Sequence, residues 1–174
     1  METLTGNVVD NRLELFFSTM LKEVYWAEQN LVNVLTTMQN AATNPELAQA
    51  FGTHRAQTEK HVKVVEEVFE AMGLPAEAER CAGLQGLFDE GWKVIDETED
   101  GTAQRDVALI IAAQKVEHYE IACYGSLCTL AITIGQTEIA KKLRKVLNEE
   151  KETDALLTII AESKINAQAS EETI

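Results

Sequence analysis

The chain has 174 residues, of which 45% are hydrophobic and 25% are charged, and its formal net charge is −14. A chain of this length can bury a substantial core by itself, so we expect one domain over residues 1–174. The acidic balance argues against nucleic acid and anionic membrane surfaces as partners, because both require a basic footprint on the protein.

Two long helices are predicted in the first part of the chain. Apolar residues keep helical spacing from about 8 to 42, and Asp10 is the predicted N-cap. The pair Asn44-Pro45 then breaks the pattern and suits the start of a second helix. That second helix should end near Met72, because the glycine and proline of Gly73-Leu-Pro75 form a stop signal.

A connection of roughly 30 residues follows, from about 73 to 101. It contains a short amphipathic helix, and we expect the face with Phe88 and Trp92 to pack on the bundle. A third long helix should run from about 102 to 134, where Gly135 ends it, and a fourth from about 137 to 165. The polar tail 166–174 is predicted to be frayed.

The lengths of these connections predict the fold. Helices one and two are joined by a tight turn, and so are helices three and four, so each pair should be antiparallel. Two helical hairpins joined by one long crossover are typical of a ferritin-like four-helix bundle. The sequence therefore predicts an all-α, ferritin-like bundle over about 8–165, whose long crossover carries a short fifth helix.

Near mid-length, the apolar stripe of each long helix is broken by residue types that bind metals. A carboxylate buried without a partner costs several kcal/mol, so polar residues at matching heights on four helices predict one shared site. The candidate ligands are Glu28 on the first helix, His54, Gln57 and His61 on the second, Glu117 and Glu120 on the third, and Glu150 and Asp154 on the fourth. A buried network of salt bridges or hydrogen bonds is the alternative, but no lysine or arginine falls on these stripes near the acids.

This donor set indicates the kind of metal. Carboxylate oxygens with one or two imidazole nitrogens suit iron, manganese or zinc, with one or two ions per chain. Tyr25 and Tyr124, each one turn from a candidate glutamate, could orient the carboxylates. The run Glu149-Glu150-Lys151-Glu152 is typical of a solvent-exposed helix face, from which only Glu150, together with Asp154 one turn later, is expected to point inward.

Four segments resemble the YciF/YciE family of bacterial ferritin-like proteins. They are Tyr25-Trp-Ala-Glu28, His54-Arg-Ala-Gln-Thr58, Lys115-Val-Glu-His-Tyr-Glu-Ile-Ala122 and Glu149-Glu-Lys-Glu-Thr-Asp154. The resemblance implies a rubrerythrin-like bundle, a homodimer, a link to bacterial stress responses and a two-metal centre. It also implies that Glu28, the pair Glu117 and Glu120, and Glu150 match carboxylate ligands of ferritin-like sites.

The chain departs from the ferritin-like pattern in two places. The usual Glu-x-x-His motif is missing from helices two and four, and Gln57 stands where relatives tend to have glutamate. A neutral amide removes one charge and one strong ligand, so we expect the site to bind one ion firmly and a second weakly, or to bind none under ordinary conditions.

Two functions therefore remain open. One is a redox enzyme whose metal pair reacts with peroxide or oxygen, and the other is a non-catalytic stress protein with a degenerate or vacant site. The start of the chain lacks the basic and then apolar run of a secretory signal, and the three cysteines show no C-x-x-C spacing. These features predict a cytoplasmic protein.

Overall fold

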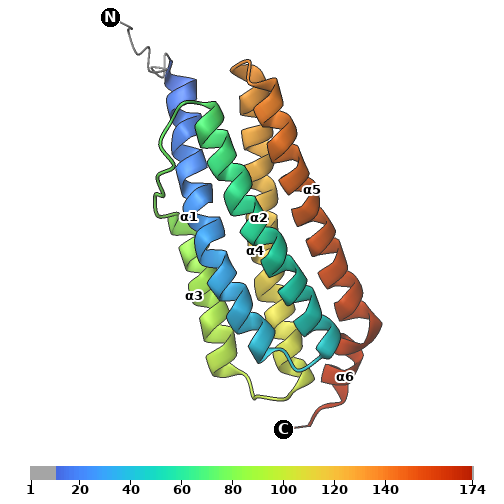
Figure 1. Ribbon diagram of the computed structural model, residues 1–174. Coiled ribbons are helices and arrows are strands. Elements are labelled where there is room, and N and C mark those ends of the chain that lie inside the picture. Colours follow the sequence, from blue (N-terminus) through green and yellow to red (C-terminus); the bar gives the residue numbers. More distant parts are fainter. Residues whose placement is uncertain (1–10, 174) are drawn as a thin grey trace, which may run out of the picture.

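The computed structural model describes residues 11–173, and these form helices without any strand (Figure 1). The elements in chain order are α1 (Arg12–Ala41), α2 (Pro45–Ala71), α3 (Ala82–Glu97), α4 (Ala103–Thr133), α5 (Thr137–Ile160), the π-helical segment η1 (Ala161–Ile165) and α6 (Asn166–Glu171). The prediction of an all-α, ferritin-like bundle is confirmed. No helix within the described range is both long enough and apolar enough to cross a membrane.

Short polar side chains and glycines set the helix ends. The predicted cap Asp10 lies outside the described residues; Asn11 caps α1 and accepts hydrogen bonds from two backbone N–H groups of its first turn, both at 2.9 Å. Asn44 caps α2 in the same way, with Pro45 in the first turn, as the sequence predicts. Gly73 and Gly135 adopt positive φ angles of 68° and 80° after α2 and α4, a conformation that glycine tolerates best.

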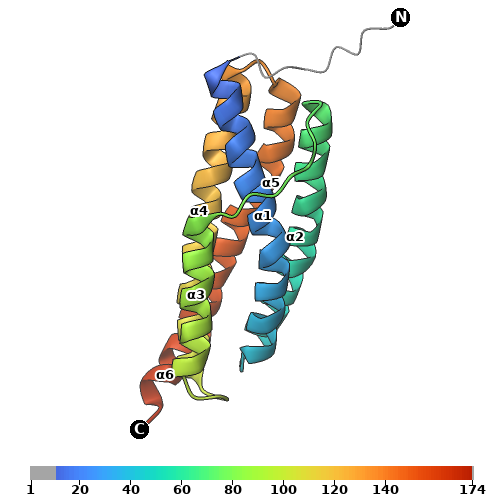
Figure 2. The same ribbon diagram turned by 90° about the vertical axis from the view of Figure 1, so that its left-hand side faces the viewer.

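The long crossover runs along the outside of α1 and returns the chain to the far end of the bundle (Figure 2). It is held there by an ion pair of 2.6 Å between Lys22 and Glu77. The helix α3 then packs beside α4 and α1, where Phe88 is buried and stacks on Trp26. The expectation for Trp92 is only partly met, because its side chain remains 37% exposed.

The end of the chain differs from the prediction. Instead of fraying after 165, it continues as α6 to Glu171. The carboxylate of Glu172 accepts hydrogen bonds from the backbone N–H groups of Ala103 and Gln104, at 2.6 and 2.9 Å. The tail thus caps the N-terminus of α4, where a negative charge is favourable because the N–H groups of the first turn have no partner within the helix.

The apolar core is divided into two halves by a layer of polar residues. One half includes Phe17, Val65, Leu127 and Leu143, and the other includes Leu31, Phe51, Leu109 and Leu157. In every long helix the polar residues lie between these halves, as the broken stripes predict.

Candidate metal centre

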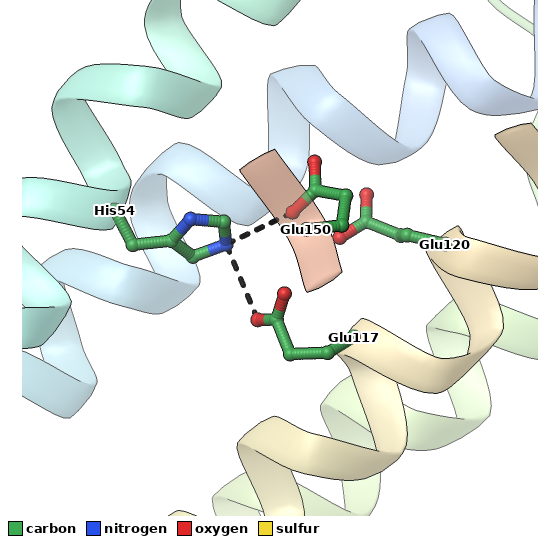
Figure 3. Close-up of side chains that lie close together, drawn as sticks. All are labelled: His54, Glu117, Glu120 and Glu150. Atoms are coloured by element: carbon green, nitrogen blue, oxygen red, sulfur yellow. Dashed lines mark ion pairs between the residues drawn. The ribbon is translucent and has the colours of Figure 1, made fainter. Parts of the chain in front are cut away.

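Six side chains from four helices meet in the polar layer, and each is at most 2% exposed. They are Glu28 of α1, His54 and His61 of α2, Glu117 and Glu120 of α4, and Glu150 of α5. Figure 3 shows four of them converging from three helices. The i, i+3 spacing on α4 and the two-turn spacing on α2 bring both members of each pair to the inner face.

The six side chains form two groups that share one carboxylate. In the first group, His54 Nε2 lies 3.2 Å from Glu117 Oε1 and 3.6 Å from Glu150 Oε2. In the second group, His61 Nδ1 lies 3.0 Å from Glu150 Oε1 and 3.6 Å from an oxygen of Glu28. Within each group the candidate ligand atoms lie within 4.8 Å of one another, and Glu120 completes the first. Glu150 thus offers one oxygen to each histidine.

Without a metal, protons must balance the charge of these carboxylates. Burial lowers the pKa of His54, but the facing carboxylates, Glu117 foremost, outweigh burial and raise it to about 9. The pKa of His61 is raised to about 11 in the same way, chiefly by Glu150 and then Glu28. These shifts favour the protonated form of both histidines at neutral pH in the metal-free protein.

Burial acts on the carboxylates in the opposite sense. It raises the pKa of Glu120 well above its ordinary value, and the neighbouring carboxylates add to the shift. Burial also raises the pKa of Glu150 to about 7, although His61 opposes this shift. A cluster of side chains whose pKa values are shifted far from their ordinary values is typical of a functional site.

The cluster is short of hydrogen bonds. Within residues 11–173, nine buried side-chain nitrogen and oxygen atoms have no hydrogen-bond partner, and eight of them belong to these six residues. The 3.0 Å approach of His61 to Glu150 is close in distance but is not aligned as a hydrogen bond. Buried polar atoms without partners are rare in folded proteins, and oxygen and nitrogen lone pairs aimed at one point suit a divalent cation.

Other polar side chains contact the cluster from outside. The hydroxyl of Tyr124 donates a hydrogen bond to Glu28, in the role the sequence suggests for it. Tyr25 instead donates to Glu66, at 2.8 Å, away from the cluster. Sequence reasoning missed two contacts: Glu149 lies 2.7 Å from His61 Nε2, and Thr153 lies 3.2 Å from His54 Nδ1. The charge run around Glu149 resembles an ordinary solvated face, and only the packing of α5 against α2 reveals its partner.

Two of the eight predicted ligands lie apart from the six. Gln57 lines a surface groove with Gln39, Arg55 and Lys60, between α1 and α2. Asp154 accepts a hydrogen bond from Gln114, at 3.1 Å, and lies 3.3 Å from the exposed His118. Gln114 and His118 both belong to α4, so the side chain of Asp154 is turned towards the outer part of α4 and not towards the six.

The donor inventory equals that of ferritin-like carboxylate sites, although its distribution differs. In those sites two helices supply one glutamate each and two supply Glu-x-x-His, which gives four glutamates and two histidines. Here the same six donors are present, but both histidines come from α2 and two glutamates come from α4. The fold and this cluster define an all-α, ferritin-like bundle with a buried carboxylate and histidine centre.

Comparison with known proteins places the chain in a family. Residues 12–170 match the family described as Domain of unknown function (DUF892), and the chain belongs to that family. Protein YciF of Escherichia coli (strain K12) is 40% identical over 158 residues, which cover 90% of this chain and 95% of YciF. These matches confirm the family resemblance that the four sequence segments indicate.

Solved structures agree with this assignment. The crystal structure of the E. coli stress protein YciF matches with a TM-score of 0.85, over 90% of this chain and 98% of that chain. YcfI from Rhodopseudomonas palustris, described as a candidate structural protein, is 31% identical and matches with a TM-score of 0.82, over 91% of this chain and 98% of its own. A protein from Xanthomonas campestris pv. campestris, 18% identical with a TM-score of 0.71 over 94% of this chain and 100% of its own, shares the fold.

Proposed function

We propose that this protein binds two divalent metal ions per chain in the bundle core, with iron as the principal candidate. The observation that carries the proposal is the set of eight buried ligand-type atoms without hydrogen-bond partners. Four carboxylates with two neutral imidazoles carry a charge of −4, and two divalent cations balance it without any bound proton. Manganese and zinc suit the same donors.

The two groups of side chains suggest how the ions would be held. His54, Glu117 and Glu120 would bind one ion, and His61 and Glu28 would bind the other. Glu150 would contact both, because each of its oxygens faces one histidine. A redox-active metal pair supplies electrons for the reduction of peroxide or oxygen, which is the catalytic form of the proposal.

The chain's own residues would prepare the site for such chemistry. The two apolar halves of the core exclude water from both sides of the polar layer, which strengthens electrostatic interactions inside it. The Tyr124 hydroxyl holds a proton next to Glu28, and burial raises the pKa of that hydroxyl well above its ordinary value. Tyr124 would therefore keep its proton and hold the Glu28 carboxylate in place.

We extend the proposal to a role in the bacterial stress response, because the 40% identical relative from E. coli is described as a stress protein. The protein would act in the cytoplasm, where its three free cysteines remain reduced. A homodimer remains a prediction from the family resemblance. Light scattering coupled to gel filtration tests it, and a monomer at micromolar concentration would contradict it.

A second function has specific support. The histidines lie close enough to Glu117 and Glu150 to balance their charge as imidazolium groups, so the cluster can persist without metal. In that case the protein is a non-catalytic bundle, in keeping with the description of the R. palustris relative.

Metal analysis separates these functions. Protein purified without chelators is incubated with ferrous iron under anaerobic conditions, desalted and analysed for metal. We expect about two ions per chain, and a large loss of iron in Glu117→Ala. The control Glu152→Ala removes an exposed carboxylate of α5 and should bind as the parent protein does. Negligible iron in the parent, at unchanged helicity, would support the metal-free bundle.

Catalysis needs its own experiment. Iron-loaded protein is mixed with hydrogen peroxide and an excess of a chemical reductant that returns ferric iron to ferrous iron after each round, and peroxide consumption above the protein-free rate is followed. Turnover that disappears in Glu117→Ala but persists in Glu152→Ala supports the redox enzyme. A fully loaded protein that consumes no peroxide or oxygen is a metal-binding protein without this activity.

A further inference from the structure

The two histidines of α2 turn opposite ring nitrogens towards the cluster. His54 directs Nε2 inward and Nδ1 outward, whereas His61 directs Nδ1 inward and Nε2 outward. The two inward nitrogens are among the buried atoms without hydrogen-bond partners. Both outward nitrogens contact α5, at Thr153 and Glu149, which lie one helical turn apart.

The hydrogen bonds of Thr153 determine the role of His54. Its hydroxyl has one hydrogen, which it donates to the backbone carbonyl of Glu149 at 3.1 Å. Towards His54 the same oxygen can only accept, so Nδ1 of that ring carries the hydrogen. In a neutral His54 the lone pair of Nε2 then points into the cluster.

Glu149 determines the tautomer of His61 in the same way, but through a carboxylate instead of a hydroxyl. An ionised carboxylate only accepts hydrogen bonds, so His61 Nε2 donates to it, at 2.7 Å. In a neutral His61 the lone pair of Nδ1 then points into the cluster. A carboxylate behind a histidine raises the basicity of that ligand more than a neutral hydroxyl does.

We propose that Glu149 and Thr153 are positioning residues that fix the two histidines in opposite tautomers and make the two halves of the centre unequal in metal affinity. The half with His61, supported by the Glu149 carboxylate, binds a divalent ion more tightly than the half with His54, supported by a hydroxyl. The proposal rests on the metal-binding function proposed above. It goes beyond that function by assigning roles to two residues that lie outside the set of six.

Nuclear magnetic resonance of the imidazole nitrogens tests the tautomers directly. Uniformly ¹⁵N-labelled protein is titrated with Zn²⁺, and long-range ¹H–¹⁵N spectra report which nitrogen of each ring binds metal. We expect metal-bound Nε2 and protonated Nδ1 for His54, and the reverse for His61. The exposed His118 is the remaining histidine of the chain and serves as internal control. If both rings bind zinc through the same nitrogen, the inference is wrong, whereas no zinc-dependent change in either ring overturns the metal-binding function itself.

Calorimetry tests the unequal affinities. Zinc should bind the parent protein in two steps of different affinity, and Glu149→Ala should weaken the tighter step about 10–100-fold. The control Glu152→Ala, which removes a charge from the same helix, should change neither step. Equal weakening of both steps, or no weakening, in Glu149→Ala would overturn the inference.

Variants of Thr153 complete the test. Thr153→Val removes the hydroxyl while keeping the shape of the side chain, and should weaken only the second step. Thr153→Ser keeps the hydroxyl and should restore the parent affinity and the parent nitrogen assignment of His54. If the serine and valine variants behave alike, Thr153 acts only through packing and has no role in setting the tautomer.

Discussion

Glu149 and Glu150 are neighbours in the sequence, but the structure gives them different environments. Glu150 is fully buried between the two histidines, whereas the side chain of Glu149 is 40% exposed and reaches His61 from the seam between α2 and α5. One residue along a helix turns the side chain by about 100°, so a single step moves it from the core to the edge. The same rotation explains why Thr153 faces His54 while Asp154 faces α4.

The position of Gln57 leads to a first prediction. Its side chain lines a surface groove, so the change Gln57→Glu should leave the number of bound metal ions and their affinities unchanged. The reason is that the new carboxylate would face the groove and not the six ligand-type side chains. Metal analysis and zinc calorimetry of the variant check this. A tighter second metal ion would show that Gln57 can turn towards the centre.

Glu120 leads to a second prediction, because its two carboxylate oxygens are buried without hydrogen-bond partners. Burial and the neighbouring carboxylates raise the pKa of Glu120, so its carboxyl stays protonated in the metal-free folded state at a pH where the unfolded chain is ionised. This difference reduces the free energy of unfolding as pH rises. Replacing Glu120 by glutamine removes the ionisable group.

At pH 8 we expect metal-free Glu120→Gln to unfold at the same temperature as the parent or a few degrees higher, since 1 kcal/mol corresponds to about 2–4 °C for a chain of this size. Zinc affinity should fall, because an amide is a weaker ligand than a carboxylate. Thermal unfolding with and without zinc measures both effects. A metal-free variant that is clearly less stable than the parent would contradict the raised pKa.

At the scale of the elements, local sequence signals predict the helices well. Asn44, Pro45, Gly73 and Gly135 act within their own turns, so their effects can be read without knowledge of the fold. Contacts between distant segments could not be predicted in this way, because they depend on how each helix is rotated in the bundle. The cap that Glu172 provides for α4 and the contact of Glu149 with His61 are both of this kind.

Asp106 also joins segments that are distant in the sequence, and it leads to a third prediction. This buried residue in the first turn of α4 accepts hydrogen bonds from the backbone N–H groups of Thr43 and Asn44, at 2.7 and 2.8 Å. It fixes the tight turn between α1 and α2 to the second hairpin. We expect Asp106→Ala to lower the free energy of unfolding by about 2–3 kcal/mol, since two charge-assisted hydrogen bonds are lost.

Urea unfolding measures this loss, with the exposed Asp96→Ala of α3 as control. The control should stay within about 0.5 kcal/mol of the parent protein. A loss of similar size in both variants would mean that Asp106 stabilises the protein through its general charge and not through the turn.

At the scale of the whole molecule, the split core explains how much of the site the sequence could predict. Apolar residues on both sides of the polar layer fix the height and the inner face of each helix, so the six clustered side chains are all among the predicted ligands. Gln57 and Asp154 lie only three and four residues from His54 and Glu150. At that spacing helical periodicity alone does not distinguish a core position from its flank.

The same layer leads to a fourth prediction, which concerns the stability of the whole protein as a function of pH. The pKa values of His54 and His61 are raised from their ordinary range to about 9 and 11 in the metal-free protein. The stabilisation from their protonated forms is complete below about pH 6.5 and is lost as pH rises through the folded-state pKa values. The raised pKa of Glu120 acts in the same direction, because its ionisation in the buried layer also costs stability.

In a metal-loaded protein the proposed ions would replace these protons, so the folded and unfolded chains would differ little in bound protons above about pH 7. The difference in unfolding temperature between zinc-loaded and metal-free protein should therefore widen as the pH is raised from about 6.5 to 8.5. Differential scanning calorimetry at matched ionic strength measures this difference, and Glu152→Ala should reproduce the parent curve. A difference that stays constant or narrows would mean that metal ions and protons do not compete for the same side chains, and the ions would then have to bind elsewhere in the molecule.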